Sequence, residues 1–482
     1  MTDFTLEIRD SDLDALRAAR TSSWWVIAGP VWLKQRLKRL GYRLRFRLLS
    51  RPWGINLTLF FARFLRGIHP VPRLGRIAVP LRAADLRNAL ERADVFNGAE
   101  DMCPRLPAGE VVLAIDWPRR HAEERARLEM VLDCVPDADD ARIRDIVRCR
   151  CTRVIGSRTT LKGVNLALLC EDVALDVAHK YLGIGVDCPD QRDHLRPIIR
   201  WLAAQVFQAP VKGSDEEIFA RVAADKMQQL AGKCLKAQED ELDTRAAKKD
   251  PIPWEEMTVM QRMLWLQQQD DAPGWLDRNW VLRNSVTLTV FGSVTLARAM
   301  TQAIPQLAQC KPRWNHARDA TEKLAGLGHE TFDHRTATPA DRFAMSSARY
   351  TMLKVVFEAM RWHPMLSMLG VRTALRETTL APDREERTKV KAGAKVLPML
   401  LAAMHDKEAF PDPGTFCPHR RTVSDYLHFG AGPHACVGHR MAEIQLEEIT
   451  FALFNHCFLK RQPRRCSPIE YDGPAVTGLE FV

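Results

Sequence analysis

One cysteine near the C-terminal end lies among glycines and before an amphipathic stretch at 441–454. The segment 429–438 reads Phe-Gly-Ala-Gly-Pro-His-Ala-Cys-Val-Gly, with the cysteine at position 436. Glycines let the backbone turn without a Cβ clash and pack closely against a flat partner. A helix that begins here aims its first N–H groups and the positive end of its dipole at the sulfur, which favours the thiolate. Such a thiolate beside a flat loop suits an axial ligand of haem iron.

A second group of residues combines one carboxylate with two guanidinium groups. Glu358 and Arg361 lie three residues apart on a helix expected over 341–361, so they share one face. A buried Glu–Arg pair needs further hydrogen bonds to offset its desolvation. Arg420, at the end of the segment Phe-Cys-Pro-His-Arg, is a natural third member.

A third group could bind two carboxylates, such as the propionates of a haem. His121 and Arg125 lie four residues apart, on one face of a helix expected to open near Pro118. Paired cationic donors of this kind hold carboxylates well. Two further candidates are His434, two residues before the cysteine, and Arg372.

Over roughly residues 80–482 the chain resembles the cytochrome P450 family, the haem-thiolate monooxygenases. The resemblance rests on Phe-x-x-Gly-x-x-x-Cys-x-Gly, on Glu-x-x-Arg completed by an arginine, and on His-x-x-x-Arg, in that family's order. It implies haem b (iron protoporphyrin IX), with Cys436 as the iron ligand, and a triad of Glu358, Arg361 and Arg420 that locks the fold beneath the haem. The other cofactor-binding residues that it implies are Phe429, Gly430, Gly438, His434, His121, Arg125 and Arg372.

The expected helix 279–303 resembles the family's long central helix above the haem. In that reading Gly292 leaves room for dioxygen, and Thr295 offers it a hydroxyl; both are the expected catalytic residues. The family has an acid before this threonine, but here that position is Val294, and Phe291 replaces a small residue. Valine cannot relay a proton, so the sequence departs from the family where dioxygen is activated.

The residues expected to face a substrate are apolar. They favour a lipid, fatty acid, terpenoid or aromatic substrate. The expected pocket residues are Phe291, Val294, Leu366, Met368 and Leu369.

Composition and periodicity predict a mostly α protein with a small β part, folded as one large catalytic domain of the cytochrome P450 type. The chain is 46% hydrophobic and 27% charged, which is ordinary globular composition. Its 12 cysteines show no disulfide framework, and neither a signal peptide nor an apolar run long enough to span a membrane is present. We therefore expect the chain in the cytoplasm.

Residues 1–80 form a leader before the catalytic domain at 81–482. No Asp or Glu occurs between residues 15 and 84, and this span includes a cluster of eight Lys and Arg residues interleaved with Trp and Leu. A basic, apolar segment of this kind suits peripheral contact with an anionic membrane, and an ordinary basic face packed on the domain is the equal alternative. We do not expect nucleic acid as a partner, because no nucleic-acid motif accompanies the patch.

Three hypotheses for function follow from this resemblance. The first is a monooxygenase that inserts one oxygen atom from dioxygen into an apolar substrate, with electrons from a separate ferredoxin or flavin reductase. The second, motivated by Val294, keeps the haem but uses peroxide or rearranges a hydroperoxide. The third is a haem-binding sensor without turnover.

Overall fold

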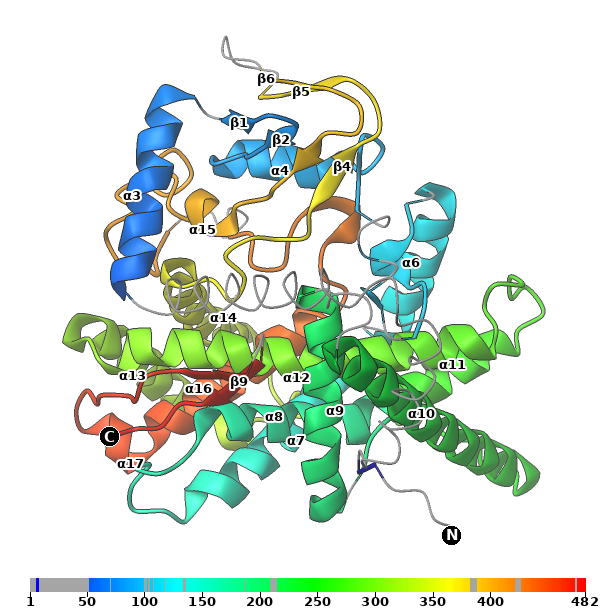
Figure 1. Cartoon of the computed structure of the whole chain (residues 1–482). Helices are drawn as coiled ribbons and strands as arrows, with labels where there is room; N and C mark the ends of the chain where they lie inside the picture. The colour runs from blue at the N-terminus through cyan, green and yellow to red at the C-terminus, as the bar shows by residue number, and fades with distance from the viewer. Residues whose placement is uncertain are drawn as a thin grey trace.

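Figure 1 shows the computed structural model of the chain, in which long helices fill one part and short strands gather beside them. The structure describes residues 6–7, 52–69, 71–98, 102, 105–106, 108–116, 118–132, 136–186, 188–208, 215–381, 388–420, 426–472 and 475–482. The basic cluster at 34–51 lies outside these described residues.

Helices make up most of the described chain, as the sequence predicts. They are α3 (Pro52–Ile68), α4 (Ala83–Glu91), α6 (Pro118–Leu132), α7 (Pro136–Cys151), α8 (Leu166–Val177), α9 (Pro189–Gln208), α10 (Asp215–Ala247), α11 (Val259–Gln267), α12 (Arg278–Ala308), α13 (Lys311–Gly326), α14 (Pro339–Trp362), α15 (Leu400–Ala403), α16 (His439–Asn455) and α17 (Cys457–Lys460).

The strands form one five-stranded sheet and two hairpins. They are β1 (Arg73–Leu74), β2 (Ile77–Ala78), β3 (Phe96–Asn97), β4 (Arg372–Ala374), β5 (Thr378–Leu380), β6 (Thr388–Val390), β7 (Lys395–Val396), β8 (Glu470–Asp472) and β9 (Ala475–Gly478). The larger sheet has the order β1-β2-β7-β4-β3, with β2 and β7 parallel and the other neighbours antiparallel. It brings segments that flank α4 together with the segment after α14.

Helix α12 runs through the middle of the helical part (Figure 1). Asp277 begins it by accepting a hydrogen bond from the backbone N–H of Trp280 at 2.7 Å, the role of an N-cap residue. Most side chains along α12 are buried in the main hydrophobic core, together with those of α8, α14 and α16. The core therefore holds α12 in place around a partly exposed stretch at Gly292.

Three local predictions from the sequence are wrong. Pro305 has no N–H and is expected to end the helix predicted at 279–303, but it lies inside α12. The dense charges of 236–250, followed by two prolines, predict an exposed connector between helices, but this run continues α10 to Ala247. The apolar residues 111–114 predict a short strand, but 112–114 form a single 3-10 turn, η3 (Val112–Ala114).

The described part of the predicted leader is packed on the body. Ile77 of β2 pairs with Lys395 of β7 in the larger sheet, and apolar residues of α3 pack on α15. The division at residue 80 remains a prediction for the residues before 52. Among the described residues, no helix is both long and apolar enough to cross a membrane.

Candidate active site

The loop from Phe429 to Gly438 folds back on itself around Cys436. The backbone N–H of Cys436 donates to the carbonyl of Phe429 at 2.8 Å, and that of Ala435 donates to Gly432 at 3.0 Å. Helix α16 begins directly afterwards at His439, and the N–H of Gly438 donates to the Cys436 sulfur. The sulfur thus faces a helix N-terminus, as the sequence predicts.

Opposing effects act on the Cys436 thiol. Burial raises the pKa of the Cys436 thiol and outweighs the Gly438 N–H and the charge of Arg125, which both lower it. A bound metal ion deprotonates a coordinating thiol. A metal ligated by this sulfur would therefore favour the predicted thiolate form.

Two glycines of the loop have left-handed backbone conformations, with φ of +76° at Gly430 and +71° at Gly432. At Gly432 a Cβ atom would also lie 2.6 Å from the Cα of Glu91, at the end of α4. The loop can approach α4 this closely only because this position has no side chain.

Glu358 of α14 is fully buried and is bound both by its own helix and by the segment that contains Cys417 and Arg420. Arg361 donates to both of its carboxylate oxygens, at 2.8 and 3.0 Å. The backbone N–H of Cys417 donates to it at 3.0 Å, and Arg420 lies 3.4 Å away. Both guanidinium groups also donate to backbone carbonyls of the segment 404–415, so the group joins α14 to the chain that leads into the ligand loop.

A fourth member of this group, Tyr426, is not among the residues predicted from the sequence. Its hydroxyl donates to Glu358 at 2.6 Å. Burial alone would raise the pKa of Glu358, but the bonds and charge of Arg361, together with Tyr426, bring that pKa below its ordinary value. The carboxylate is therefore ionised and fully hydrogen-bonded, which a buried charge requires.

The four predicted carboxylate binders gather around Asp116. The rings of His121 and His434 meet edge to face at 4.5 Å, and His434 Nε2 lies 3.5 Å from Asp116. Arg125 donates to two loop carbonyls, at 2.7 and 2.8 Å. Burial, with His434 and Arg125 adding to it, lowers the pKa of His121 to about 4.

Two groups of this cluster fit the carboxylates of a haem. Arg372 is largely desolvated, which lowers its pKa, and its one hydrogen bond to a described residue is a long one of 3.4 Å to the Gly370 carbonyl. His434 Nδ1 is buried without a hydrogen-bond partner among the described residues. Buried donors of this kind normally have acceptors, so this donor set suits the propionates of a haem held by Cys436.

One stretch of α12 is open. Phe291, Gly292 and Thr295 are half-buried, whereas most of the helix around them is buried. A Cβ atom on Gly292 would meet no other atom within 4 Å. The helix thus leaves space beside Gly292, where the sequence predicts that dioxygen is accommodated.

No acid that could relay a proton is present anywhere in α12, in line with the prediction from Val294. Its 31 residues include no Asp or Glu. The Thr295 hydroxyl donates to the Phe291 carbonyl at 2.6 Å, and Val294, expected to line the pocket, is 4% exposed and packs in the main core. Because α12 turns by about 100° per residue, Val294 lies about 60° around the helix from Phe291 and about 100° from Thr295, at the border of the face that these two residues share.

The side chain of Phe291 joins three apolar segments. Its ring lies 5.7 Å from that of Phe207, near the end of α9, and it packs on a small cluster that includes Leu106 and Val111. The predicted pocket residues Leu366, Met368 and Leu369 are all half-buried. Phe207 and Leu106 were missed, because no local pattern indicates which distant segment meets α12.

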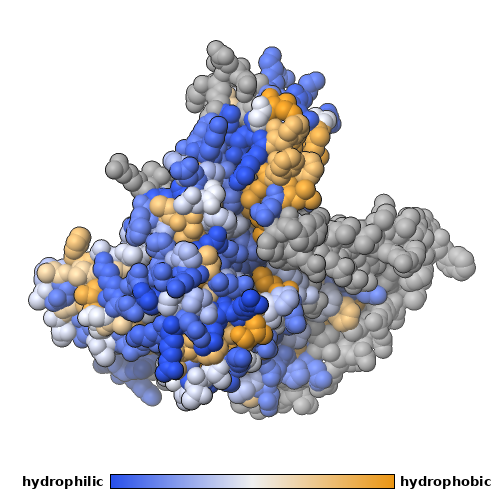
Figure 2. All heavy atoms as spheres, turned by 90° about the vertical axis from the view of Figure 1, so that its left-hand side faces the viewer, coloured by the Kyte–Doolittle hydropathy of each residue, from blue (hydrophilic) through white to orange (hydrophobic). Residues whose placement is uncertain are grey.

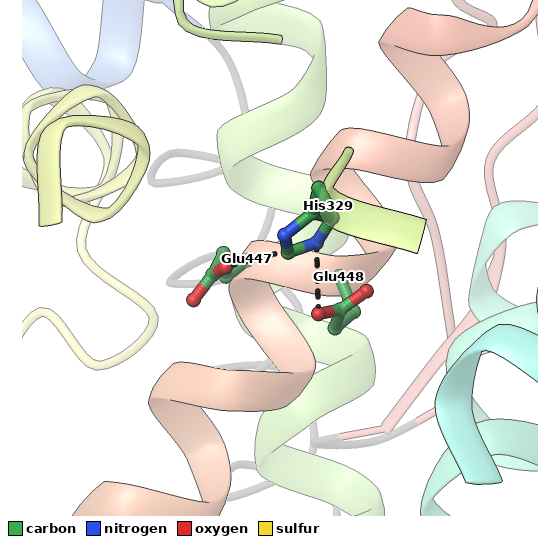
Figure 3. A group of neighbouring side chains, drawn as sticks. All are labelled: His329, Glu447 and Glu448. Atoms are coloured by element: carbon green, nitrogen blue, oxygen red, sulfur yellow. Dashed lines mark ion pairs between the residues drawn. The ribbon is translucent and has the colours of Figure 1, made fainter. Parts of the chain in front are cut away.

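A second buried charge cluster lies on α16, far along the helix from Cys436 (Figure 3). His329 Nε2 is 3.0 Å from Glu448 and 3.9 Å from Glu447. Arg144 of α7 donates to both carboxylates, at 2.7 to 3.0 Å, and Arg148 donates to Glu448. Although this histidine and these glutamates could chelate a metal, the guanidinium groups already use their oxygens, so we interpret the cluster as a fastening of α16 to α7.

The sequence places four cationic residues around the ligand loop that could dock an acidic electron donor: Arg420, Arg421, His439 and Arg440. Two of them are already engaged. Arg420 is bound to Glu358, and Arg440 forms an ion pair with Asp140. His439 remains exposed, and residue 421 lies outside the described residues.

Comparisons with known proteins agree with this geometry. The Cytochrome P450 family profile matches residues 200–479. A bifunctional dioxygenase–epoxy alcohol synthase of Pyricularia oryzae is 35% identical over 92 residues, which are 19% of this chain and 8% of that protein. A probable cytochrome P450 6a19 of Drosophila melanogaster is 33% identical over 133 residues, a quarter of each chain. The matches thus cover less than a tenth of the first of these relatives.

Among solved structures, the haem domain of Acinetobacter radioresistens CYP116B5 has a TM-score of 0.64. The alignment covers 89% of this chain and 94% of that one, at 15% identity, so it shows the fold. The chain belongs to the cytochrome P450 family, and it has the mostly helical fold that it shares with solved members of that family. The family implies a haem cofactor, a substrate, dioxygen and a redox partner.

Proposed function

We propose that this enzyme inserts one oxygen atom from dioxygen into an apolar substrate, with electrons from a separate ferredoxin or flavin reductase. The observation that carries the proposal is the enclosed Cys436 sulfur, beside unsatisfied donors that suit haem b. When bound, a haem with a thiolate ligand supplies the oxygen-activating chemistry. The substrate class follows from the apolar surroundings of Phe291, which favour a lipid, terpenoid or aromatic compound.

The chain's own residues have distinct tasks in this proposal. Cys436 would ligate a bound haem iron, and the Gly438 N–H would moderate the electron density of the sulfur through its hydrogen bond. Arg372, Arg125 and the two histidines would hold the propionates. Phe291 and Phe207 position the substrate and exclude water from it.

The test is an optical titration of the purified protein with fatty acids, terpenoids and small aromatics, following the haem Soret band. Apolar ligands should shift the band by displacing axial water, and the best binder indicates the substrate class. Cys436→Ser should lose the thiolate-type spectrum, whereas Cys457→Ser, an exposed cysteine on α17, should keep it. A purified protein that binds no haem, or an unchanged spectrum in Cys436→Ser, would refute the assignment.

A second candidate function is use of peroxide or rearrangement of a hydroperoxide. It is favoured by the absence of an acid from α12 and by the engaged Thr295 hydroxyl. One relative is named an epoxy alcohol synthase. An epoxy alcohol and a lipid hydroperoxide each carry two oxygen atoms, so that conversion needs neither outside oxygen nor a reductase.

The two candidates are separated by the source of oxygen. The second predicts turnover with peroxide or a lipid hydroperoxide alone, and no gain in that turnover from Val294→Asp. A large gain of the same variant in reductase-coupled turnover would instead favour the first.

A further inference from the structure

The residues in the middle of α12 that are not buried lie on one side of the helix. Between residues 284 and 304 they are Phe291, Gly292, Thr295 and Arg298, and all their neighbours in this stretch are buried. Positions 291, 295 and 298 are four and three residues apart, so they share one face. The open stripe that begins at the space beside Gly292 therefore ends at an arginine.

Two other elements border this stripe. The ring of Phe207, near the end of α9, lies 5.7 Å from that of Phe291. Strand β9 packs against both α9 and α12, and its partner β8 includes Tyr471, whose hydroxyl is close to the charge of Arg298. The stripe thus has an apolar end between two aromatic rings and a polar end at the β8–β9 hairpin.

The polar end of the stripe offers hydrogen-bond donors and a positive charge. Helix α12 has no Asp or Glu, so no acid of this helix offsets the charge of Arg298. Burial raises the pKa of Tyr471, although the charge of Arg298 and a hydrogen bond with Gln302 act to lower it. The phenol therefore keeps its proton at neutral pH. A guanidinium group with a phenol close to it suits a carboxylate.

We propose that Arg298, with Tyr471 close to it, binds the carboxylate of the substrate, which is a carboxylic acid with a long apolar chain, such as a fatty acid. This inference rests on the proposed function and narrows its substrate class. The apolar chain runs along the stripe toward Phe291. Because α12 rises by about 9 Å between Gly292 and Arg298, carbons several bonds from the carboxylate lie in the space beside Gly292.

The experiment compares two ligands that differ in charge, a straight-chain fatty acid and its methyl ester. Each is titrated at neutral pH into the full-length, haem-loaded protein while the Soret band is followed. The wild type should bind the acid at least about tenfold more tightly than the ester, because hydrogen bonds to a charged group discriminate on this scale. Arg298→Gln should remove this preference and leave the affinity for the ester unchanged.

Two further variants refine the test. Arg278→Gln, at the exposed first residue of α12, is the matched control and should keep the preference of the wild type. Tyr471→Phe should weaken binding of the acid by about threefold, because it removes one neutral donor. Equal haem content and thermal midpoints would show that the variants are folded.

Fatty acids also adhere to apolar surfaces outside a pocket. The large hydrophobic area in the upper half of Figure 2 lies on the outside of the molecule, and Phe60, Phe61 and Phe64 of α3 are each more than half exposed. The variant Phe60→Ser/Phe64→Ser should therefore leave the ratio of the two affinities unchanged. A changed ratio would assign the preference to that surface and overturn the proposal.

Three other results would overturn the proposal. Equal affinities of the wild type for acid and ester would remove the carboxylate site but leave the apolar pocket of the proposed function in place. An unchanged preference in Arg298→Gln would assign the carboxylate to another cation. An equal loss of affinity for both ligands in this variant would show that Arg298 only supports the fold. If neither ligand moves the Soret band of the wild type, the proposal and the apolar substrate class both fail.

Discussion

On the Cys436 side, the buried Arg361 of α14 donates to three backbone carbonyls of the segment 404–415, and the loop itself packs against α4. Around Gly292, α12 offers half-buried side chains, a glycine with open space, and no acid along its length. The side that we propose holds the cofactor is thus closed by polar bonds, whereas the side that we propose meets oxygen and substrate is shaped by apolar packing.

Because of this difference, the two sides should tolerate amino-acid substitutions to different degrees. A buried charge network loses several kcal/mol when one member is removed, because its partners stay buried without compensation. An apolar, partly open surface changes its shape at small cost. Substitutions on the Cys436 side should therefore affect folding, and those on the α12 side should affect which molecules bind and react.

The largest effect is expected for Glu358→Gln. Removing this charge leaves Arg361 and Arg420 without their carboxylate, which should lower the free energy of unfolding by about 3–5 kcal/mol. Denaturant unfolding of the haem-loaded protein measures it. Glu322→Gln, at an exposed position of α13, is the control and should stay within about 0.5 kcal/mol of the wild type. Equal behaviour of the two variants would contradict the comparison.

Next in size is Phe291→Ala, which removes the ring between α12 and Phe207. We expect bulky ligands to gain affinity relative to slender ones by about tenfold, because pocket shape sets discrimination on this scale. Dissociation constants from Soret titrations with a fused-ring terpenoid and a straight-chain fatty acid give this ratio. Phe332→Ala, on the connection between α13 and α14, should leave the ratio unchanged.

A smaller effect concerns Asp85 of α4, the helix against which the ligand loop packs. Burial, with Asp406 and Glu408 adding to it, raises the pKa of Asp85 from 3.8 to about 6, and one of its oxygens has no hydrogen-bond partner. The folded protein therefore binds this proton more tightly than the unfolded chain, so stability falls as pH rises from about 4 to about 6.

Asp85→Asn removes this penalty. The free energy of unfolding of this variant should equal that of the wild type at about pH 4. Above about pH 6 it should exceed the wild-type value by about 1 to 2 kcal/mol. Unfolding at both pH values provides the measurement. A gain that is the same at both, or a loss that grows with pH, would show that the charge is compensated.

The smallest effect is expected for Thr295→Val. Its hydroxyl is already used by the Phe291 carbonyl, and α12 has no acid to relay a proton through it. Turnover should change by less than about threefold, whereas loss of a proton-transfer group costs about 100-fold or more. The measurement is the rate of product formation, with a reductase and with peroxide alone. A loss of about 100-fold in either rate would contradict this expectation.

The parts of the site that the sequence predicts are those with short, regular spacings. Glu358 and Arg361 share a helix face by their spacing alone, and the glycines around Cys436 identify a loop without its neighbours. Phe207 and Tyr426 were missed because their partners lie far away in the chain. Glu447 and Glu448 carried a usable signal, two adjacent acids within an amphipathic helix, but their arginines come from α7.

The fold was predictable to a similar degree. Helix α14 and the mostly α composition are confirmed, because long apolar periodicity decides them. Pro305 was expected to end α12, yet the helix continues because tertiary packing along α12 outweighs the lost hydrogen bond. The sequence shows that Val294 replaces the family's acid. It does not show that the Val294 side chain packs in the hydrophobic core.

The two left-handed glycines of the ligand loop have different consequences for mutational tolerance. At Gly430 a Cβ would find its nearest neighbour at 3.8 Å, so the restriction is on backbone conformation, and asparagine is a workable replacement. At Gly432 a Cβ would collide with the backbone of α4. In a saturation library of the ligand loop, position 430 should therefore yield a few survivors, while position 432 should yield none.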